Sequence, residues 1–126
     1  MNEHGTFCWN ELNTREPRKA TEFYGKTLGW TFETMNMPDV DYTIVRSGET
    51  MVGGIFEMKG PEFDGIPSHW FSYIAVDDVD ACVEAAKKAG ATIKRAPWDI
   101  PGVGRIAIVQ DPTGAVAGWM TPVEGS

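Results

Sequence analysis

The sequence predicts an α+β fold in which a strand–helix–strand–strand–strand module occurs twice. The main observation is an internal repeat. Residues 43–58 (TIVRSGETMVGGIFEM) and residues 107–120 (AIVQDPTGAVAGWM) align without a gap when Val45 is set on Val109. Each copy is also preceded by a strand pattern and then a helix pattern. The whole chain has 126 residues, the length of one ordinary domain.

The first module is expected over residues 1–60 and begins with a strand. Residues 6–12 (TFCWNEL) alternate in polarity, and Pro17 then suits a first helical turn, where its missing N–H costs nothing. Gly29 ends this helix. The apolar positions at helical spacing are Ala20, Phe23, Tyr24 and Leu28. The three further strands are predicted at residues 30–36, 41–46 and 51–57.

The second module is expected over residues 69–126, after a Pro-rich linker at residues 60–68 (GPEFDGIPS). Residues 69–76 (HWFSYIAV) predict its first strand. Asp77 or Asp78 caps the following helix, and Gly90 closes it. Its apolar stripe comprises Val79, Cys82, Val83, Ala86 and Ala89. The remaining strands are predicted at residues 91–98, 104–110 and 115–121.

Composition and charge limit the classes of partner. The net charge is −7, from 11 basic and 18 acidic residues, and the basic residues are scattered. Such a surface repels phosphate backbones and anionic membranes, so neither nucleic acid nor a membrane is expected as a partner. Two cysteines make no disulfide framework, and the sequence shows neither a signal peptide nor a span of ~20 apolar residues. A cytoplasmic location is therefore expected.

Three sequence motifs in the right order resemble those of one known family. They are AxxFYGKTLGW (residues 20–30), YIAVDDVDACVEAAKKAGA (residues 73–91) and GRIAIVQDPTGA (residues 104–115). With WxELxT at residues 9–14, the chain resembles the vicinal oxygen chelate superfamily, that of glyoxalases, bleomycin-resistance proteins and dioxygenases. The resemblance implies a curved eight-stranded mixed-sheet cup lined by both modules of a single domain, and a homodimer.

Members of this superfamily hold one divalent metal with His, Gln or Glu ligands from the first and last strands of each module. Carried over by motif, the first-strand positions are Trp9, fifteen residues before the Tyr of the FY pair, and Phe71, five before Val76. The last-strand positions are Gly118, four residues after the Gly of the DPTG turn, and its repeat twin Gly54. None of the four side chains can ligate such a metal. We therefore expect no metal and no other cofactor.

Strand alternation indicates what replaces the metal. Phe7 and Glu11 share a face with Trp9, and His69 and Tyr73 share a face with Phe71. Gly54 and Gly118 would leave room opposite, which suits a planar or apolar organic ligand. In the alternative interpretation, Trp9 and Phe71 are core side chains that fill the space of the lost metal. Glu11 is then a solvated strand residue, and His69 lies at the rim of the pocket or on the surface. Both interpretations remain open at this point.

The function predicted from these features is metal-free binding of a small organic molecule. The alternative is an enzyme of the lactoylglutathione lyase, dioxygenase or isomerase type, with a relocated metal or with metal-free acid–base chemistry. In the metal-free case Glu11 or His69 would act as general base and Tyr73 would donate to an oxyanion. A subunit without a ligand is a third possibility.

Overall fold

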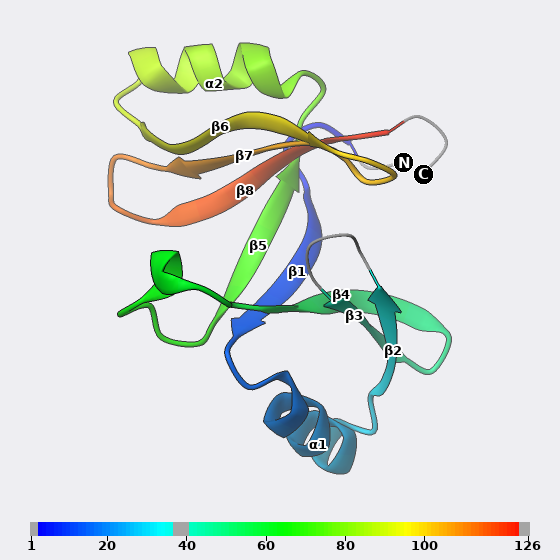
Figure 1. Ribbon diagram of the computed structural model, residues 1–126. Helices are drawn as coiled ribbons and strands as arrows, with labels where there is room; N and C mark the ends of the chain where they lie inside the picture. The colour runs from blue at the N-terminus through cyan, green and yellow to red at the C-terminus, as the bar shows by residue number, and fades with distance from the viewer. Residues whose placement is uncertain (1–2, 37–40, 124–126) are drawn as a thin grey trace. The chain divides into compact units, whose positions relative to one another are not determined.

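The computed structural model describes residues 3–36 and 41–123, and the predicted order of elements is present in them (Figure 1). The first module comprises β1 (Phe7–Thr14), α1 (Pro17–Leu28), β2 (Thr31–Asn36), β3 (Asp41–Ser47) and β4 (Thr50–Glu57). The second comprises β5 (His69–Ala75), α2 (Val79–Lys88), β6 (Thr92–Ile100), β7 (Gly104–Gln110) and β8 (Val116–Pro122). A short 3₁₀ turn, Pro61–Phe63, lies between the modules.

The strands follow the order β2-β3-β4-β1-β5-β8-β7-β6. β1 pairs with β4 and β5 pairs with β8 in parallel, whereas the hairpin pairs are antiparallel. The parallel registers place Glu11 opposite Gly54 and Tyr73 opposite Gly118. Gly54 and Gly118 are equivalent in the gapless repeat alignment, and Glu11 and Tyr73 each lie two residues after the equivalent first-strand positions Trp9 and Phe71. The predicted fold class, two βαβββ modules with a mixed sheet, is confirmed.

Two compact units can be distinguished in the chain. One comprises Met1–Trp9 with Ser72–Ser126, and the other comprises Asn10–Phe71. β1 and β5 therefore each contribute residues to both units. Within the first unit the backbone N–H of Gly5 donates to the carbonyl of Ala75 (2.7 Å). The N–H of Ala75 donates to the carbonyl of Thr6 (2.8 Å).

The Asn10–Phe71 unit is organised by α1. Pro17 occupies the first turn, and Gly29, with a φ of 71°, ends the helix by donating its N–H to the carbonyl of Gly25 (3.2 Å). The helix covers one face of the strands of its module, where the buried core is formed. The buried side chains there are Leu12, Val45 and Ile55, with Ala20 and Tyr24 packed against them from α1.

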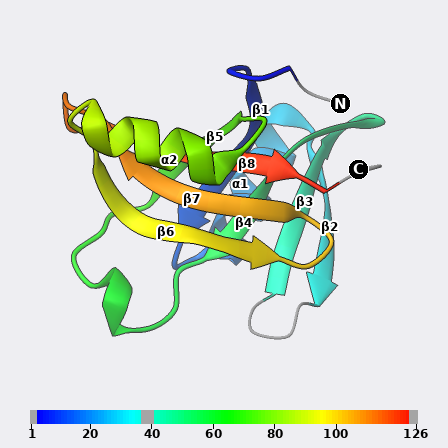
Figure 2. The same cartoon turned by 90° about the horizontal axis from the view of Figure 1, so that it is seen from above.

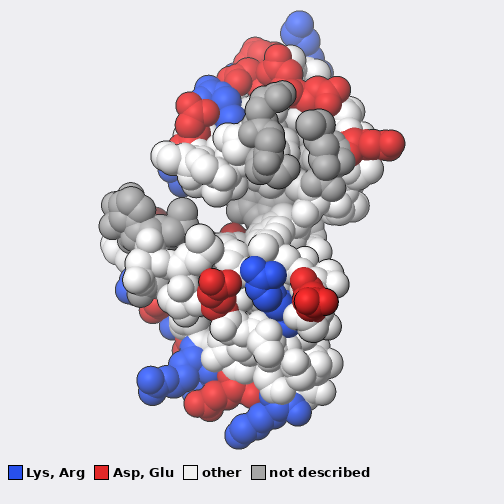
Figure 3. Space-filling model, turned by 90° about the vertical axis from the view of Figure 1, so that its right-hand side faces the viewer, with Lys and Arg blue, Asp and Glu red and all other residues white. Residues whose placement is uncertain are grey.

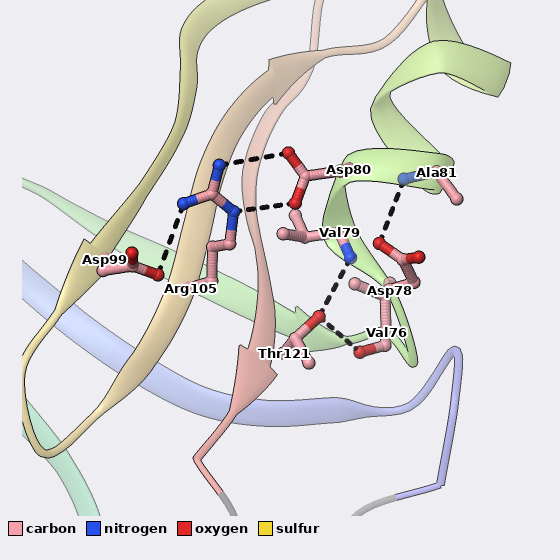
Figure 4. Close-up of polar contacts among 8 residues, drawn as sticks. All are labelled: Val76, Asp78, Val79, Asp80, Ala81, Asp99, Arg105 and Thr121. Atoms are coloured by element: carbon pink, nitrogen blue, oxygen red, sulfur yellow. Dashed lines mark hydrogen bonds and ion pairs between the residues drawn. The ribbon is translucent and has the colours of Figure 1, made fainter.

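The other unit is organised by α2, which lies across β6, β7 and β8 (Figures 1 and 2). The Asp78 side chain caps α2 by accepting from the N–H of Ala81 (3.2 Å). The hydroxyl of Thr121 accepts from the N–H of Val79 and donates to the carbonyl of Val76, both at 2.9 Å (Figure 4). Strand β8 therefore supplies a second cap to the helix.

An exposed ion cluster ties α2 to the hairpin β6–β7 (Figure 4). Arg105 donates to both carboxylate oxygens of Asp80 (2.7 and 3.1 Å) and lies 3.3 Å from Asp99. The hydrogen bond from Arg105 lowers the pKa of Asp80 below its ordinary value of 3.8. Because the folded-state pKa is lowered, the resulting stabilisation is fully present above pH 3.8 and is lost as the pH falls through the lowered value.

Two surface properties bear on partners. On the face in Figure 3, Lys and Arg side chains are interspersed with Asp and Glu rather than gathered into a basic patch. Among the described residues, no helix combines the length and the apolar character that crossing a bilayer requires.

Candidate functional site

The site residues predicted from the sequence are divided between the two units. Phe7, Trp9, Tyr73 and Gly118 belong to the unit with α2, and Glu11, Gly54, His69 and Phe71 belong to the unit with α1. Phe7 is exposed, Trp9 and Tyr73 are half-buried and Gly118 is buried. Tyr73 and Gly118 lie opposite each other on β5 and β8. That all eight residues form one pocket stays a prediction.

Glu11 and Gly54 form the corresponding pair of the α1 unit. They lie opposite each other on the parallel strands β1 and β4. Gly54 is buried, and Glu11 is only 9% exposed. The interpretation of Glu11 as a solvated strand residue is therefore wrong. A carboxylate is rarely buried to this extent unless its oxygens are engaged.

The room predicted beside Gly54 is occupied by the side chain of Tyr42. A Cβ built on Gly54 would lie 2.0 Å from the Tyr42 hydroxyl oxygen and 2.3 Å from its Cζ atom. Tyr42 is two residues from Ile44, the register partner of Gly54, and so lies on the same face of the sheet. The Tyr42 ring therefore packs directly against Gly54. A glycine within a strand allows a neighbouring group to approach this closely because it has no side chain.

Tyr42 is a site residue that the sequence analysis missed. The aligned repeat begins one residue later, at Thr43, so Tyr42 has no counterpart in it. Alternation along β3 was the available signal, since it places Tyr42 on the face of Gly54. The physical correction is that Gly54 leaves no open space beside it, because it is covered by a phenol from its own module.

His69 and Phe71 share a face, as alternation predicted. Their ring centroids are 6.2 Å apart at an interplanar angle of 77°. Nδ1 of His69 lies 2.8 Å from the carbonyl oxygen of Pro67, which can only accept. The neutral ring therefore carries its proton on Nδ1, and Nε2 is the nitrogen that can take up a proton.

Comparison with known proteins identifies the family. The sequence profile of the Glyoxalase/Bleomycin resistance protein/Dioxygenase superfamily matches residues 6–117. The chain belongs to this superfamily. The match covers both modules of the fold, so the predicted family is confirmed.

Sequence relatives within the superfamily carry differing names. The chain is 41% identical over 123 residues to "Putative glyoxylase CFP32" of Mycobacterium bovis, with 97% of this chain and 46% of that protein covered. It is 30% identical to the "Anthracycline biosynthesis protein DnrV" of Streptomyces peucetius, with 88% of this chain and 45% of that protein covered. The chain thus spans about half the length of these relatives.

Solved structures of the superfamily share the fold. A hypothetical protein, BH1468, from Bacillus halodurans superposes with a TM-score of 0.74 at 14% identity, covering 98% of this chain and 99% of that one. Methylmalonyl-CoA epimerase from Mycobacterium tuberculosis superposes with a TM-score of 0.69 at 13% identity, covering 98% and 93%. Identities this low establish the architecture and not the chemistry.

The residues at the four positions predicted from the sequence to correspond to the superfamily's metal ligands do not fit a divalent ion. At Gly54 a ligating side chain would have to occupy the space of the Tyr42 ring. Trp9, Phe71 and Gly118 offer no lone pair suited to such an ion. Across residues 3–36 and 41–123, no group of three or more His, Cys, Asp or Glu side chains is arranged to hold a metal. We derive no chemistry through a metal at these positions.

Proposed function

We propose that this chain is a glyoxalase-like protein that binds a small organic molecule without a chelated metal. The observation that carries the proposal is the Tyr42 phenol lying against Gly54, next to the buried Glu11. A phenol thus covers Gly54, one of the four positions predicted to correspond to metal ligands in the superfamily, and a carboxylate lies opposite it on β1. Both groups form strong hydrogen bonds in a dry environment, so they suit a neutral polar group on a ligand.

The ligand that best matches the remaining predicted lining is planar and largely apolar. Trp9, Phe71 and Tyr73 supply flat surfaces, and aromatic rings favour offset or edge contacts with other rings. Two relatives are named anthracycline biosynthesis proteins, and anthracyclines are planar fused-ring compounds with carbonyl and hydroxyl groups. We infer that a hydroxylated aromatic of this kind is a suitable first probe, and that the protein binds it as a cytoplasmic homodimer.

A metal-free acid–base enzyme is the second candidate, favoured by the burial of Glu11 and by the geometry of His69. Glu11 is 9% exposed, and a carboxylate at such a position can act as the general base toward a bound carbon acid or hydroxyl. The Nε2 atom of His69 offers a second base because Nδ1 is engaged by Pro67. Tyr73 remains the proposed oxyanion donor.

Titration with daunorubicin, an anthracycline, tests the binding function. We expect saturable one-to-one quenching of the ligand's fluorescence, and an at least tenfold weaker Kd for Trp9→Ala. Trp119→Ala is the matched control, because Trp119 packs against the core beneath α2 and its side chain lies on the opposite face of β8 from Gly118. Absence of saturation, or equal weakening by both variants, would overturn the proposal.

The enzyme candidate is separated by a turnover assay with the same protein. Formation of S-lactoylglutathione from methylglyoxal and glutathione is followed for the natural chain and for Glu11→Gln, which keeps the size of the side chain. The enzyme is favoured if the natural chain turns over the substrate and Glu11→Gln does not. The Kd of Glu11→Gln for daunorubicin should then stay within about twofold of that of the natural chain. No turnover in either protein supports the binding function.

A further inference from the structure

A cavity of about 310 Å³ lies within the Asn10–Phe71 unit, on the α1 side of its sheet. Its lining comprises Asn10, Trp30, Val45, Val52, Gly53 and Trp70. Val45 belongs to the core beneath α1, and Trp30 and Val52 pack against that core. Because strand side chains alternate, Glu11 and Gly54 face the other side of the sheet. The cavity is therefore separate from the site proposed above.

A β-bulge and a glycine of β4 lie at the edge of the hollow. Val45 pairs with Gly53 and Arg46 pairs with Met51, so Val52 is the extra residue of β4. A bulge re-aims its side chains, and here Val52 joins the core beneath α1. Gly53 adds no side chain, and a Cβ there would lie 2.3 Å from the carbonyl oxygen of Asn10. Gly53 therefore permits the close approach of β1 to β4, and no larger side chain at this position could extend into the hollow.

Two indole rings form fixed walls. Trp30 stacks on Tyr24 (centroids 5.0 Å apart, 26° between planes), and Trp70 meets Trp30 edge-on (6.1 Å, 85°). Nε1 of Trp70 donates to the hydroxyl of Tyr24 (3.2 Å), which fixes the orientation of the indole. Trp70 nevertheless remains 45% exposed, and the neighbouring Phe23 is 58% exposed. Exposed aromatic surface gathered at a preformed hollow is typical of a binding site rather than of core packing.

We propose that this cavity binds a flat, uncharged aromatic molecule of one or two fused rings. The volume sets the size, since a cavity of about 150 Å³ accepts benzene and drug-sized ligands need about 300–1,000 Å³. The perpendicular indoles offer one face and one edge to the same ring, the two arrangements that aromatic pairs prefer. None of the six lining residues is charged, so an ionised ligand would lose hydration without compensation.

The experiment uses 2-naphthol and the indole N–H signals of the ¹⁵N-labelled protein. The chain has five tryptophans, whose signals are assigned by single Trp→Phe variants. We expect saturable shifts of the Trp30 and Trp70 signals with a Kd on the order of 0.1–1 mM, as for a ligand of this size. The signals of Trp98 and Trp119 should change little, because neither residue lines the cavity.

Two variants locate the site. Trp70→Ala removes one wall, and Val52→Phe fills the cavity while leaving both indoles in place. Each should weaken 2-naphthol binding at least tenfold. Trp98→Ala should leave it unchanged, because Trp98 lies outside the Asn10–Phe71 unit that holds the cavity. If Trp70→Ala does not fold, Val52→Phe alone decides. Unsaturable shifts, or an unchanged Kd in Val52→Phe, would overturn the proposal.

Discussion

Replacing Gly53 with alanine is expected to lower the free energy of unfolding by about 3 kcal/mol. The new Cβ would lie 2.3 Å from the carbonyl oxygen of Asn10 and 3.3 Å from its carbonyl carbon. Both atoms are backbone, so β1 and β4 must separate to relieve the overlap. The adjacent register pairs include Leu12 with Ile55, whose side chains form the core beneath α1. The measurement is urea unfolding followed by circular dichroism.

Gly25→Ala is the matched control, because it makes the same chemical change in the same unit. A Cβ at Gly25 would meet Phe32 at 3.6 Å and the carbonyl of Trp30 at 3.7 Å, which are ordinary contacts. Gly25 lies within α1, where alanine is favoured over glycine by roughly 0.5–1 kcal/mol. This variant should therefore be neutral or slightly more stable. Equal destabilisation by both variants would show that the β1–β4 approach is not the cause.

Gly54→Ala is expected to cost about 2 kcal/mol, but only while Tyr42 is present. The overlapping atoms here belong to the end of the Tyr42 side chain, the nearest being its hydroxyl oxygen at 2.0 Å. The ring must turn away and give up its packing against the glycine. In a Tyr42→Ala background the same substitution should cost less than about 0.5 kcal/mol, because the obstructing ring is gone.

The double-mutant cycle of these two positions measures the coupling directly. We expect a coupling free energy of about 1.5 kcal/mol, obtained from urea unfolding of the four proteins. Additive effects, within about 0.5 kcal/mol, would mean that Tyr42 does not lie on Gly54 in solution. The metal-free interpretation of this half of the site would then lose its structural basis.

The secondary structure could be predicted because its signals are local. Pro17 and Gly29 bound α1, and Asp78 caps α2, each through a hydrogen-bonding or backbone preference that acts within a few residues. The gapless alignment of Val45 with Val109 further predicted which strand residues are equivalent, and the registers of Glu11 with Gly54 and of Tyr73 with Gly118 agree with it.

The contacts that define the sites could not be predicted because they are long-range. The position of Tyr42 depends on how far β3 slides along β4, and a bulge at Val52 changes that register within the hairpin. The hydrogen bond from Trp70 to Tyr24 joins residues 46 apart in the sequence. The bridging role of Thr121 between β8 and α2 similarly follows only from tertiary packing, since its partner Val79 is 42 residues away.

The central claim is tested most directly by metal binding to the purified chain. The chain is titrated isothermally with Zn²⁺, Ni²⁺, Co²⁺, Mn²⁺ and Mg²⁺, and each mixture is examined by native mass spectrometry and by measurement of its Tm. The account predicts no ion held at one per chain and no rise in Tm of more than about 1 °C, because stoichiometric binding would stabilise the fold. One ion per chain, bound with a Kd of about 1 μM or tighter and lost in Glu11→Gln, would contradict it.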